Sequence, residues 1–311
     1  MNEKVKLISG NSNLPLAQKI SDYLNIPLCD AEIKRFSDGE ISVKINENIR
    51  GTDVFIIQST NPPAENLLEL LVITDAAKRA SAERITVVIP YYGYARQDRK
   101  DQPRVPITSK LVANLITVSG PNRVLTMDLH AAQIQGFFDI PMDHLFSNPV
   151  FYDYFADFES NEWVVVADLG SIKMVRNFAK KLSMPFAVLD KKRHVANQVE
   201  ILNVIGEVEG KNIIIRDDIV DTAGTLTQAA DFLIKQGAKE IYAGCTHPVL
   251  SGRSLELIEK SPIKKVVVSD TIDVENKKLS SKYEITSVGR IFGEAIKRIH
   301  EGESVSSLFE Y

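Results

Sequence analysis

Cysteine is scarce in this 311-residue sequence, which contains only Cys29 and Cys245, far apart and each without a C-x-x-C partner. Two isolated cysteines favour a reducing compartment. The first residues, MNEKVKLISG, lack the apolar core of a signal peptide, and no apolar run approaches the length of a membrane helix. We therefore expect a cytoplasmic protein without a membrane partner.

A strong excess of positive charge is also missing. The net charge of −4 argues against a general attraction to nucleic acid, so we expect no nucleic-acid partner and only local basic sites. A hydrophobic share of 44% and a charged share of 25% are those of a globular protein. The length favours two domains of about 150 residues each.

Two common glycine motifs for nucleotide binding are absent. There is no G-x-x-x-x-G-K-S/T, since Gly206–Lys211 has too short a spacing, and there is no G-x-G-x-x-G. What recurs instead is an acid or a cation where an expected strand ends, which is the edge where open α/β sheets bind ligands. These positions are Asp128 with His130, Asp168, Lys191 with Arg193, and the group Asp217, Asp218 and Asp221.

The most informative stretch is residues 212–230, NIIIRDDIVDTAGTLTQAA. A buried strand at 212–215 precedes the three acids, and helical spacing begins at Leu226 after a turn of small residues. Amides at a helix start bind phosphate, while carboxylates accept hydrogen bonds from hydroxyls or hold a metal, so the stretch suits a sugar phosphate. The alternative is a strand, a capped turn and a helix without a ligand. The turn residues are Thr222, Ala223, Gly224 and Thr225.

Apolar strands alternate with helical segments along the whole chain, which predicts mainly parallel sheets flanked by helices. The second half repeats the scheme of the first, so we expect an α/β protein of two similar domains, residues 1–148 and 149–311. We expect the final helix and tail to pack on the first domain. The strands are expected at 4–9, 53–58, 84–90, 122–127, 162–167, 186–189, 212–215, 240–245 and 264–269.

Two segments of the first half fall outside this alternation. Residues 36–40, FSDGE, precede an alternating strand and predict a hairpin with an Asp-Gly turn. Residues 91–106, YYGYARQDRKDQPRVP, contain three tyrosines and four cations without periodicity. This segment is either a solvated surface loop or a lid that closes over a polyphosphate, for which Arg96 offers a planar fork of donors.

These motifs together resemble the ribose-phosphate pyrophosphokinase (PRPP synthetase) family over about residues 5–311. The resemblance implies two type I phosphoribosyltransferase-like domains. It also implies transfer of the diphosphoryl group of MgATP to the 1-hydroxyl of ribose 5-phosphate, giving 5-phosphoribosyl 1-diphosphate (PRPP) and AMP for nucleotide biosynthesis. The segments that carry it are FSDGE at 36–40, RASAERITVVIPYYGYARQDRK at 79–100, TMDLHAAQIQGFFDIP at 126–141 and DDIVDTAGT at 217–225.

The resemblance also implies roles for individual residues. ATP binding falls to Phe36, Asp38, Gly39, Glu40, Arg96 and Gln97, and a magnesium site to His130 and Asp168. Catalysis falls to Lys191 and Arg193, and ribose 5-phosphate binding to Arg193, Asp217, Asp218, Asp221 and the turn Thr222, Ala223, Gly224 and Thr225. Mg²⁺ is the implied cofactor. A homohexamer built from dimers is the implied assembly, with phosphate and ADP as regulators.

One segment departs from the family pattern. Ser171 stands where the family has a second glycine after Asp168, and its Cβ would matter if a ligand must approach the backbone. A non-catalytic regulatory relative is therefore one alternative. A type I phosphoribosyltransferase, suggested by the 217–225 loop alone, is the other, although it has no need of the FSDGE and YARQDRK segments.

Overall fold

The computed structural model describes residues 4–168, 171–195 and 198–308. By its contacts the chain divides into two compact units. Unit 1 contains residues 4–146, 271–273 and 288–308, and unit 2 contains the described residues of 147–270 and 274–287. The last helix, α8, therefore belongs to unit 1.

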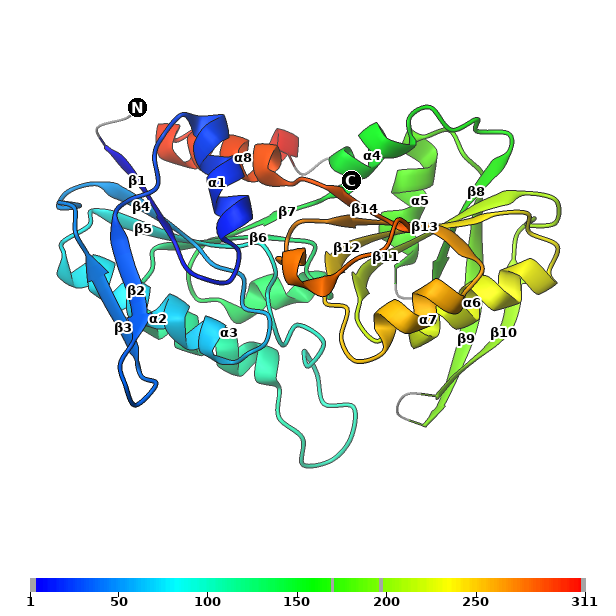
Figure 1. The fold of residues 1–311 in the computed structure, drawn as a ribbon, viewed down its shortest axis with the longest axis horizontal. Coiled ribbons are helices and arrows are strands. Elements are labelled where there is room, and N and C mark those ends of the chain that lie inside the picture. Colours follow the sequence, from blue (N-terminus) through cyan, green and yellow to red (C-terminus); the bar gives the residue numbers. More distant parts are fainter. Residues whose placement is uncertain (1–3, 169–170, 196–197, 309–311) are drawn as a thin grey trace. The chain divides into compact units, whose positions relative to one another are not determined.

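Unit 1 is built on a five-stranded parallel sheet in the order β1-β4-β5-β6-β7 (Figure 1). The central strands are mainly apolar, and all five residues of β4 are buried. Burial on both faces is what a parallel sheet covered by helices requires. The strands are β1 (Val5–Ser9), β4 (Asp53–Ile57), β5 (Arg84–Ile89), β6 (Arg123–Met127) and β7 (Met142–Leu145).

Helices cover both faces of this sheet, with α1 and α8 on one face and α2 and α3 on the other (Figure 1). Helices α1 and α8 approach so closely that a Cβ at Gly293 would lie 2.4 Å from a ring carbon of Tyr23. The alternation of strands and helices confirms the predicted α/β class. The helices are α1 (Leu14–Leu24), α2 (Glu65–Arg79), α3 (Thr108–Ser119) and α8 (Gly289–Glu301).

A buried carboxylate ties the end of α8 to the sheet. Asp53, on β4, accepts a hydrogen bond from Arg84 Nε at 2.9 Å, and its Oδ2 lies 2.9 Å from Nδ1 of His300. Arg84 also donates to the carbonyl of Ile299 at 3.0 Å. Segments far apart in the sequence thus meet in one charged cluster within unit 1.

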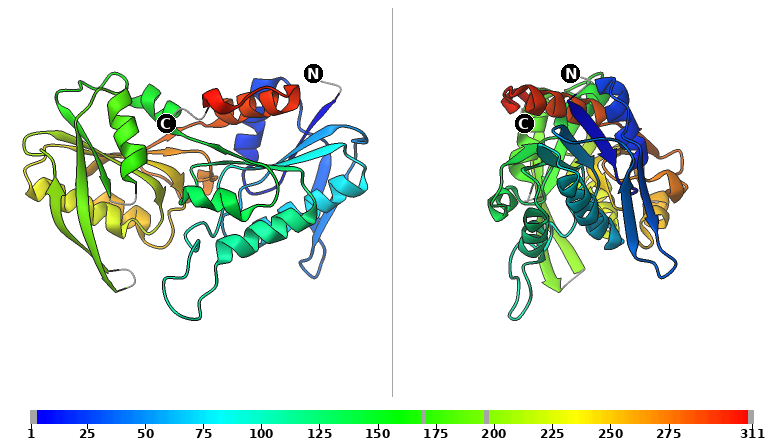
Figure 2. Two further views of the ribbon diagram at one scale, coloured as in Figure 1. Left: turned by 180° about the vertical axis from the view of Figure 1, so that it is seen from behind. Right: turned by 90° about the vertical axis from the view of Figure 1, so that its left-hand side faces the viewer.

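A separate antiparallel hairpin, β2 (Ala31–Arg35) and β3 (Ile41–Ile45), also belongs to unit 1. It confirms the hairpin predicted around the Asp-Gly pair. Figures 1 and 2 show this hairpin and the loop of residues 91–106 both standing away from the five-stranded sheet. Ile33 and Val43 of the hairpin nevertheless pack against the core of unit 1, and Tyr92 and Ala95 at the start of the loop belong to that core.

Unit 2 is built on a seven-stranded sheet in the order β10-β9-β8-β11-β12-β13-β14. Neighbouring strands are parallel except β9 and β10, which are antiparallel. The strands are β8 (Trp163–Asp168), β9 (Phe186–Val195), β10 (Gln198–Ile205), β11 (Asn212–Val220), β12 (Ile241–Pro248), β13 (Ile263–Ser269) and β14 (Tyr283–Thr286).

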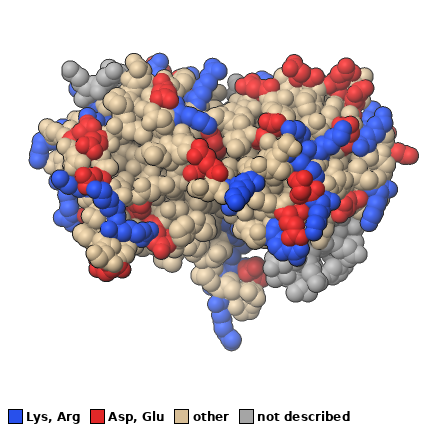
Figure 3. Space-filling model, in the orientation of Figure 1, with Lys and Arg blue, Asp and Glu red and all other residues tan. Residues whose placement is uncertain are grey.

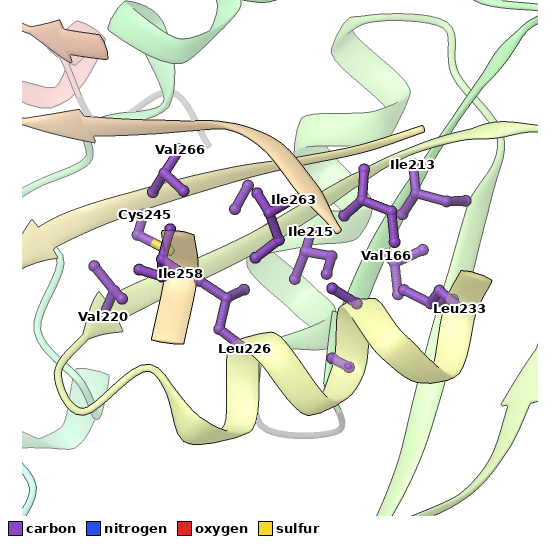
Figure 4. Close-up of a cluster of buried hydrophobic side chains, with 14 of the residues drawn as sticks. Val166, Ile213, Ile215, Val220, Leu226, Leu233, Cys245, Ile258, Ile263 and Val266 are labelled. Atoms are coloured by element: carbon purple, nitrogen blue, oxygen red, sulfur yellow. The ribbon is translucent and has the colours of Figure 1, made fainter. Parts of the chain in front are cut away.

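Each face of the second sheet has its own core. Helices α6 (Gly224–Lys235) and α7 (Ser254–Lys260) pack on one face, where aliphatic side chains such as Ile215 and Leu226 interlock (Figure 4). Helices α4 (Asn148–Phe155) and α5 (Ile172–Lys181) pack on the other, around an aromatic cluster. Each fully buried large apolar side chain contributes about 1.5–3 kcal/mol. Strand β11 is therefore held from both sides.

Two boundaries differ from the sequence-based expectation. Strand β9 continues to Val195 instead of ending at Leu189, because β10 pairs with it along the additional residues. Helix α4 begins at Asn148, where the sequence predicted only a domain boundary. Among the described helices none is both long and apolar enough to cross a membrane.

Candidate active site

The acid-rich stretch of unit 2 lies where β11 leads into α6. Strand β11 pairs with β8 only over Asn212–Ile215, but it pairs with β12 as far as Val220. The sequence predicted that this strand ends at residue 215, before the acids, but the strand continues through them to Val220. Asp217 and Asp218 belong to an extension with a neighbouring strand on one side only, and both are half-buried.

The turn after these acids presents backbone amides. Ala223 has a left-handed φ of +62°, which is uncommon for a residue other than glycine, and α6 begins at Gly224. Alanine has no group that can cap a helix, so the amides of the first turn receive no hydrogen bond from its side chain. These amides and the helix dipole favour an anion at this end of α6.

Hydrogen bonds orient the carboxylates beside this turn. Asp217 Oδ1 accepts the N–H of Asp218 at 2.9 Å. Asp221 Oδ1 accepts the hydroxyl of Ser251 at 2.5 Å, and the Ser251 N–H donates to the Asp221 carbonyl at 3.1 Å. These bonds leave the negative charges in place, so the group can accept hydrogen bonds from hydroxyls or bind a cation.

Three further predicted residues lie on β8, the neighbour of β11, and on β9, the next strand of the sheet. Asp168 is the last residue of β8, and Lys191 and Arg193 lie in β9. Strands β8 and β9 are parallel, with Asp168 opposite Leu189, so the backbone places these positions toward the same edge of the sheet. The side chains of Asp168, Lys191 and Arg193 lie outside the described part of the structure.

Ser171, the departure from the family pattern, precedes the first residue of α5. Its φ is −104°, a value that any residue adopts, and its carbonyl accepts the N–H of Val175 at 3.0 Å. The backbone at this position therefore does not require glycine. The neighbouring Leu169 and Gly170 lie outside the described residues.

In unit 1 the predicted ATP-binding residues of the hairpin form its tip. Two backbone bonds close the turn, from Phe36 N to Glu40 O at 2.8 Å and from Gly39 N to Phe36 O at 2.9 Å. Gly39 has a φ of +95°, which explains the glycine, and Asp38 Oδ1 accepts the Glu40 N–H at 3.1 Å. The Phe36 side chain is 59% exposed, so an aromatic face is available to a planar ligand.

The loop of residues 91–106 contains no helix or strand, and its base is anchored. Gln97 Oε1 accepts the hydroxyl of Thr108 at 2.5 Å, and the Gln97 carbonyl accepts the N–H of Ser109 at 3.1 Å. Asp98 accepts a bond from Gln133 at 3.1 Å. Arg96 is exposed, and Figure 3 shows positive charge extending from the tip of the loop.

A tight turn follows β6 and presents His130, which is exposed. Asp128 has a φ of +38°, and its N–H donates to the Leu145 carbonyl at 3.0 Å. The N–H of Leu129 donates to Nε2 of the buried His144 at 2.8 Å. Two residues of β7 therefore hold the turn. His144 was not predicted from the sequence, because nothing in its neighbourhood marks a histidine on one strand as the acceptor for a turn after another strand.

No group of three or more histidine, cysteine or acidic side chains that could hold a metal occurs within the described parts of the chain. Asp168, the predicted ligand in unit 2, is not among the side chains described. In unit 2 the structure brings the acids and the turn together at the end of β11. In unit 1 the predicted residues occupy three separate segments: the hairpin tip, the anchored loop and the turn after β6.

Comparison with known proteins covers nearly the whole chain. The family model for the N-terminal domain of ribose phosphate pyrophosphokinase matches residues 5–120, and the phosphoribosyl synthetase-associated domain matches residues 192–310. The ribose-phosphate pyrophosphokinase of Chlorobaculum tepidum is 55% identical over 312 residues, with 100% of this chain and 96% of that protein covered. That of Caldanaerobacter subterraneus is also 55% identical, with 98% of each covered.

A solved structure agrees with these matches. The crystal structure of phosphoribosylpyrophosphate synthetase from Mycobacterium smegmatis superposes with a TM-score of 0.90 at 33% sequence identity. It covers 96% of this chain and 100% of that one. The chain therefore belongs to the ribose-phosphate pyrophosphokinase family.

Proposed function

We propose that this protein transfers the diphosphoryl group of MgATP to the 1-hydroxyl of ribose 5-phosphate, giving PRPP and AMP. The observation that carries the proposal is the 55% identity to a ribose-phosphate pyrophosphokinase over the full chain, including the segments of both units that bear the site residues. A non-catalytic relative has no supporting observation among the described residues or the relatives compared.

Ribose 5-phosphate binds at the end of β11. The amides of Thr222, Ala223, Gly224 and Thr225 take the 5-phosphate, which the N-terminus of α6 attracts. Asp217, Asp218 and Asp221 accept hydrogen bonds from the sugar hydroxyls, since an ionised carboxylate only accepts such bonds. The half-buried acids beside amides of an uncapped helix start support this division of roles.

ATP binds through segments of unit 1. The exposed ring of Phe36 stacks on adenine, and Asp38, Gly39 and Glu40 contact the base from the same turn. Arg96 and Gln97 contact the nucleotide from the base of the 91–106 loop. Because Gln97 is anchored to Thr108, this part of the loop keeps its place while Arg96 extends from it.

The reaction forms a bond from the 1-hydroxyl oxygen of the sugar to the β-phosphorus of ATP. The bond from that phosphorus to the oxygen bridging it to the α-phosphorus breaks, AMP leaves, and the hydroxyl proton is lost. Negative charge shifts toward the transferred group and the leaving oxygen. Lys191 supplies a compact positive charge and Arg193 a planar fork for these oxygens, which lowers the barrier if they bind the transition state more tightly than the ground state.

Magnesium is the metal that this chemistry calls for. Mg²⁺ prefers oxygen ligands and commonly binds through one or two carboxylates together with substrate phosphates, so a three-residue protein cluster is not required. Asp168 fits this preference, and His130 is the second candidate ligand. When bound, the ion neutralises charge on the phosphate oxygens.

We also propose that the protein assembles as a homohexamer built from dimers, with phosphate and ADP as regulators, and that it acts in the cytoplasm. These proposals rest on membership of the family. Sedimentation analysis at several protein concentrations tests the assembly, and a stable monomer would contradict it.

One assay tests the central reaction. Ribose 5-phosphate and MgATP are mixed with the purified protein in phosphate buffer, and AMP and PRPP are quantified against a reaction with a chelator of magnesium. Equal amounts of AMP and PRPP are expected, and no AMP at saturating substrates would rule the proposal out. Consumption of added PRPP with a free nucleobase would favour a phosphoribosyltransferase instead.

A further inference from the structure

Arg216 is the largest fully buried side chain of the described structure, with 1% of its surface exposed. It continues the apolar run of β11 and stands directly before Asp217. Arginine remains charged at any pH that a folded protein tolerates, so it cannot avoid the cost of burial by losing its proton. A buried guanidinium at the end of an otherwise apolar strand therefore calls for an explanation.

The guanidinium joins three segments of unit 2. One terminal nitrogen donates to the carbonyls of Asp217 and, at 3.1 Å, of Gly244 on β12. The other donates to the hydroxyls of Ser147 at 2.9 Å and Thr246 at 3.0 Å. The Arg216 side chain thus links β11, β12 and the residue that precedes α4.

Aromatic packing fixes the plane of this group. The central guanidinium carbon lies 4.1 Å from the centre of the Phe151 ring on α4, a distance at which a cation is attracted to a ring face. The side chain also packs on the backbone of Gly244, where a Cβ would be in ordinary contact with the Cδ of Arg216 at 3.4 Å and with the Phe151 ring at 3.5 Å. The guanidinium therefore has one well-defined position.

That position lies beside the acids that begin the ribose 5-phosphate loop. Arg216 holds the carbonyl of Asp217, while the carboxylate of Asp217 accepts the next N–H along the chain. Cys245 lies opposite Asp217 on β12, and the charges of Arg216, Asp217 and Asp218 all affect the pKa of its thiol. Burial and then Asp217 raise the pKa of this thiol, Arg216 opposes the rise, and Asp218 adds to it.

We propose that Arg216 is a positioning residue for ribose 5-phosphate, which fixes the Asp217 carbonyl and supplies a positive charge directly before the two acids in the strand. This inference rests on the proposed role of residues 217–225. Strand β11 has no β8 partner beyond Ile215, and the bonds of the guanidinium to Gly244 and Thr246 add to the pairing with β12 that supports the strand extension. Without it, the acids keep their charge and lose both their fixed backbone and their nearby counter-charge.

The test compares Arg216→Met and Arg216→Lys with the unaltered protein. Methionine fills similar space without charge or donors, while the hydroxyls of Ser147 and Thr246, 2.8 Å apart, can satisfy each other. The substitution removes the cost of burying the charge, but it also leaves the carbonyls of Asp217 and Gly244 without this donor. We expect Arg216→Met to lower the unfolding temperature, because the carbonyls of Asp217 and Gly244 lose a donor, and to raise the KM for ribose 5-phosphate at least tenfold, with the KM for MgATP changed less than about twofold.

Arg216→Lys keeps the charge but not the planar fork of donors, so its KM for ribose 5-phosphate is expected to lie between those of the unaltered protein and of Arg216→Met. Ile214→Ala is the matched control, because Ile214 lies two residues earlier on the same face of β11 and is fully buried. It should lower the unfolding temperature and leave the ratio of the two KM values unchanged. Hydrogen exchange of the amides at 217–225 should be faster in Arg216→Met than in the control.

The outcomes separate this inference from the proposed function. If the unaltered protein is active and Arg216→Met has the same KM for ribose 5-phosphate, the positioning role is overturned and the proposed function stands. Equal rises in both KM values, or the same exchange rates in Arg216→Met and Ile214→Ala, would also overturn it. Failure of the unaltered protein to form AMP would instead remove the proposed function.

Discussion

Truncating Phe36 isolates the proposed adenine contact. The ring is 59% exposed, and the turn around it is closed by backbone bonds that do not involve the side chain. Phe36→Ala should therefore change the free energy of unfolding by no more than about 0.5 kcal/mol. Stacking of an aromatic ring on a base contributes about 1–3 kcal/mol, which corresponds to about a 5-fold to 150-fold rise in the KM for MgATP.

The measurement is the initial rate of AMP formation, with MgATP varied at saturating ribose 5-phosphate and then the reverse. Phe36→Tyr retains the ring and should keep the KM of the unaltered protein. Leu14→Ala is the control, since Leu14 is another apolar side chain of unit 1 with a similar exposure of 55%. An unchanged KM for MgATP in Phe36→Ala, or an equal rise for both substrates, would refute the stacking argument.

Three further predictions concern catalysis, pH and the turn after β6. Lys191→Ala should abolish turnover while calorimetry shows nearly unchanged binding of an ATP analogue, because its charge acts mainly in the transition state; equal losses would contradict that role. Lys6 lowers the pKa of Glu47 below 4.5, so the stability that Glu47 adds is present above that pH and is lost as the pH falls through the lower folded value. Urea unfolding should show Glu47→Gln less stable than the unaltered protein at pH 7 and equally stable at strongly acidic pH. A difference in unfolding free energy that does not change with pH would contradict this role of the ionised Glu47. His144→Phe removes the acceptor of the Leu129 N–H and should cost about 1–3 kcal/mol in the same experiment, with a loss below about 0.5 kcal/mol arguing against the bond.

Local chemistry made much of the fold predictable. The Asp-Gly pair at 38–39 predicted the hairpin, because a turn with positive φ favours glycine, and Gly39 has a φ of +95°. The mainly apolar run at 84–90 predicted β5, because a strand buried on both faces lacks the regular alternation of apolar and polar residues. These features depend only on residues that are neighbours in the chain.

The remaining features depend on partners far away in the sequence. Asp217 and Asp218 are strand residues because β12 accompanies β11 beyond the end of its pairing with β8. Arginine is normally an exposed residue, and Arg216 is buried only because Ser147, Gly244 and Thr246 supply acceptors from other segments. Periodicity does not carry such information.

The assignment of α8 to unit 1 has a consequence for the order of biosynthesis. Residues 147–287 leave the ribosome before α8, and at about 5–20 residues per second these roughly 140 residues take about 7–30 seconds. During that interval the buried side chains of α8, including Phe292 and Ile296, are not yet present to cover α1. Newly made unit 1 therefore exposes an apolar face that a chaperone can bind, and translation of the carboxyl-terminal helix is the event that closes the amino-terminal unit.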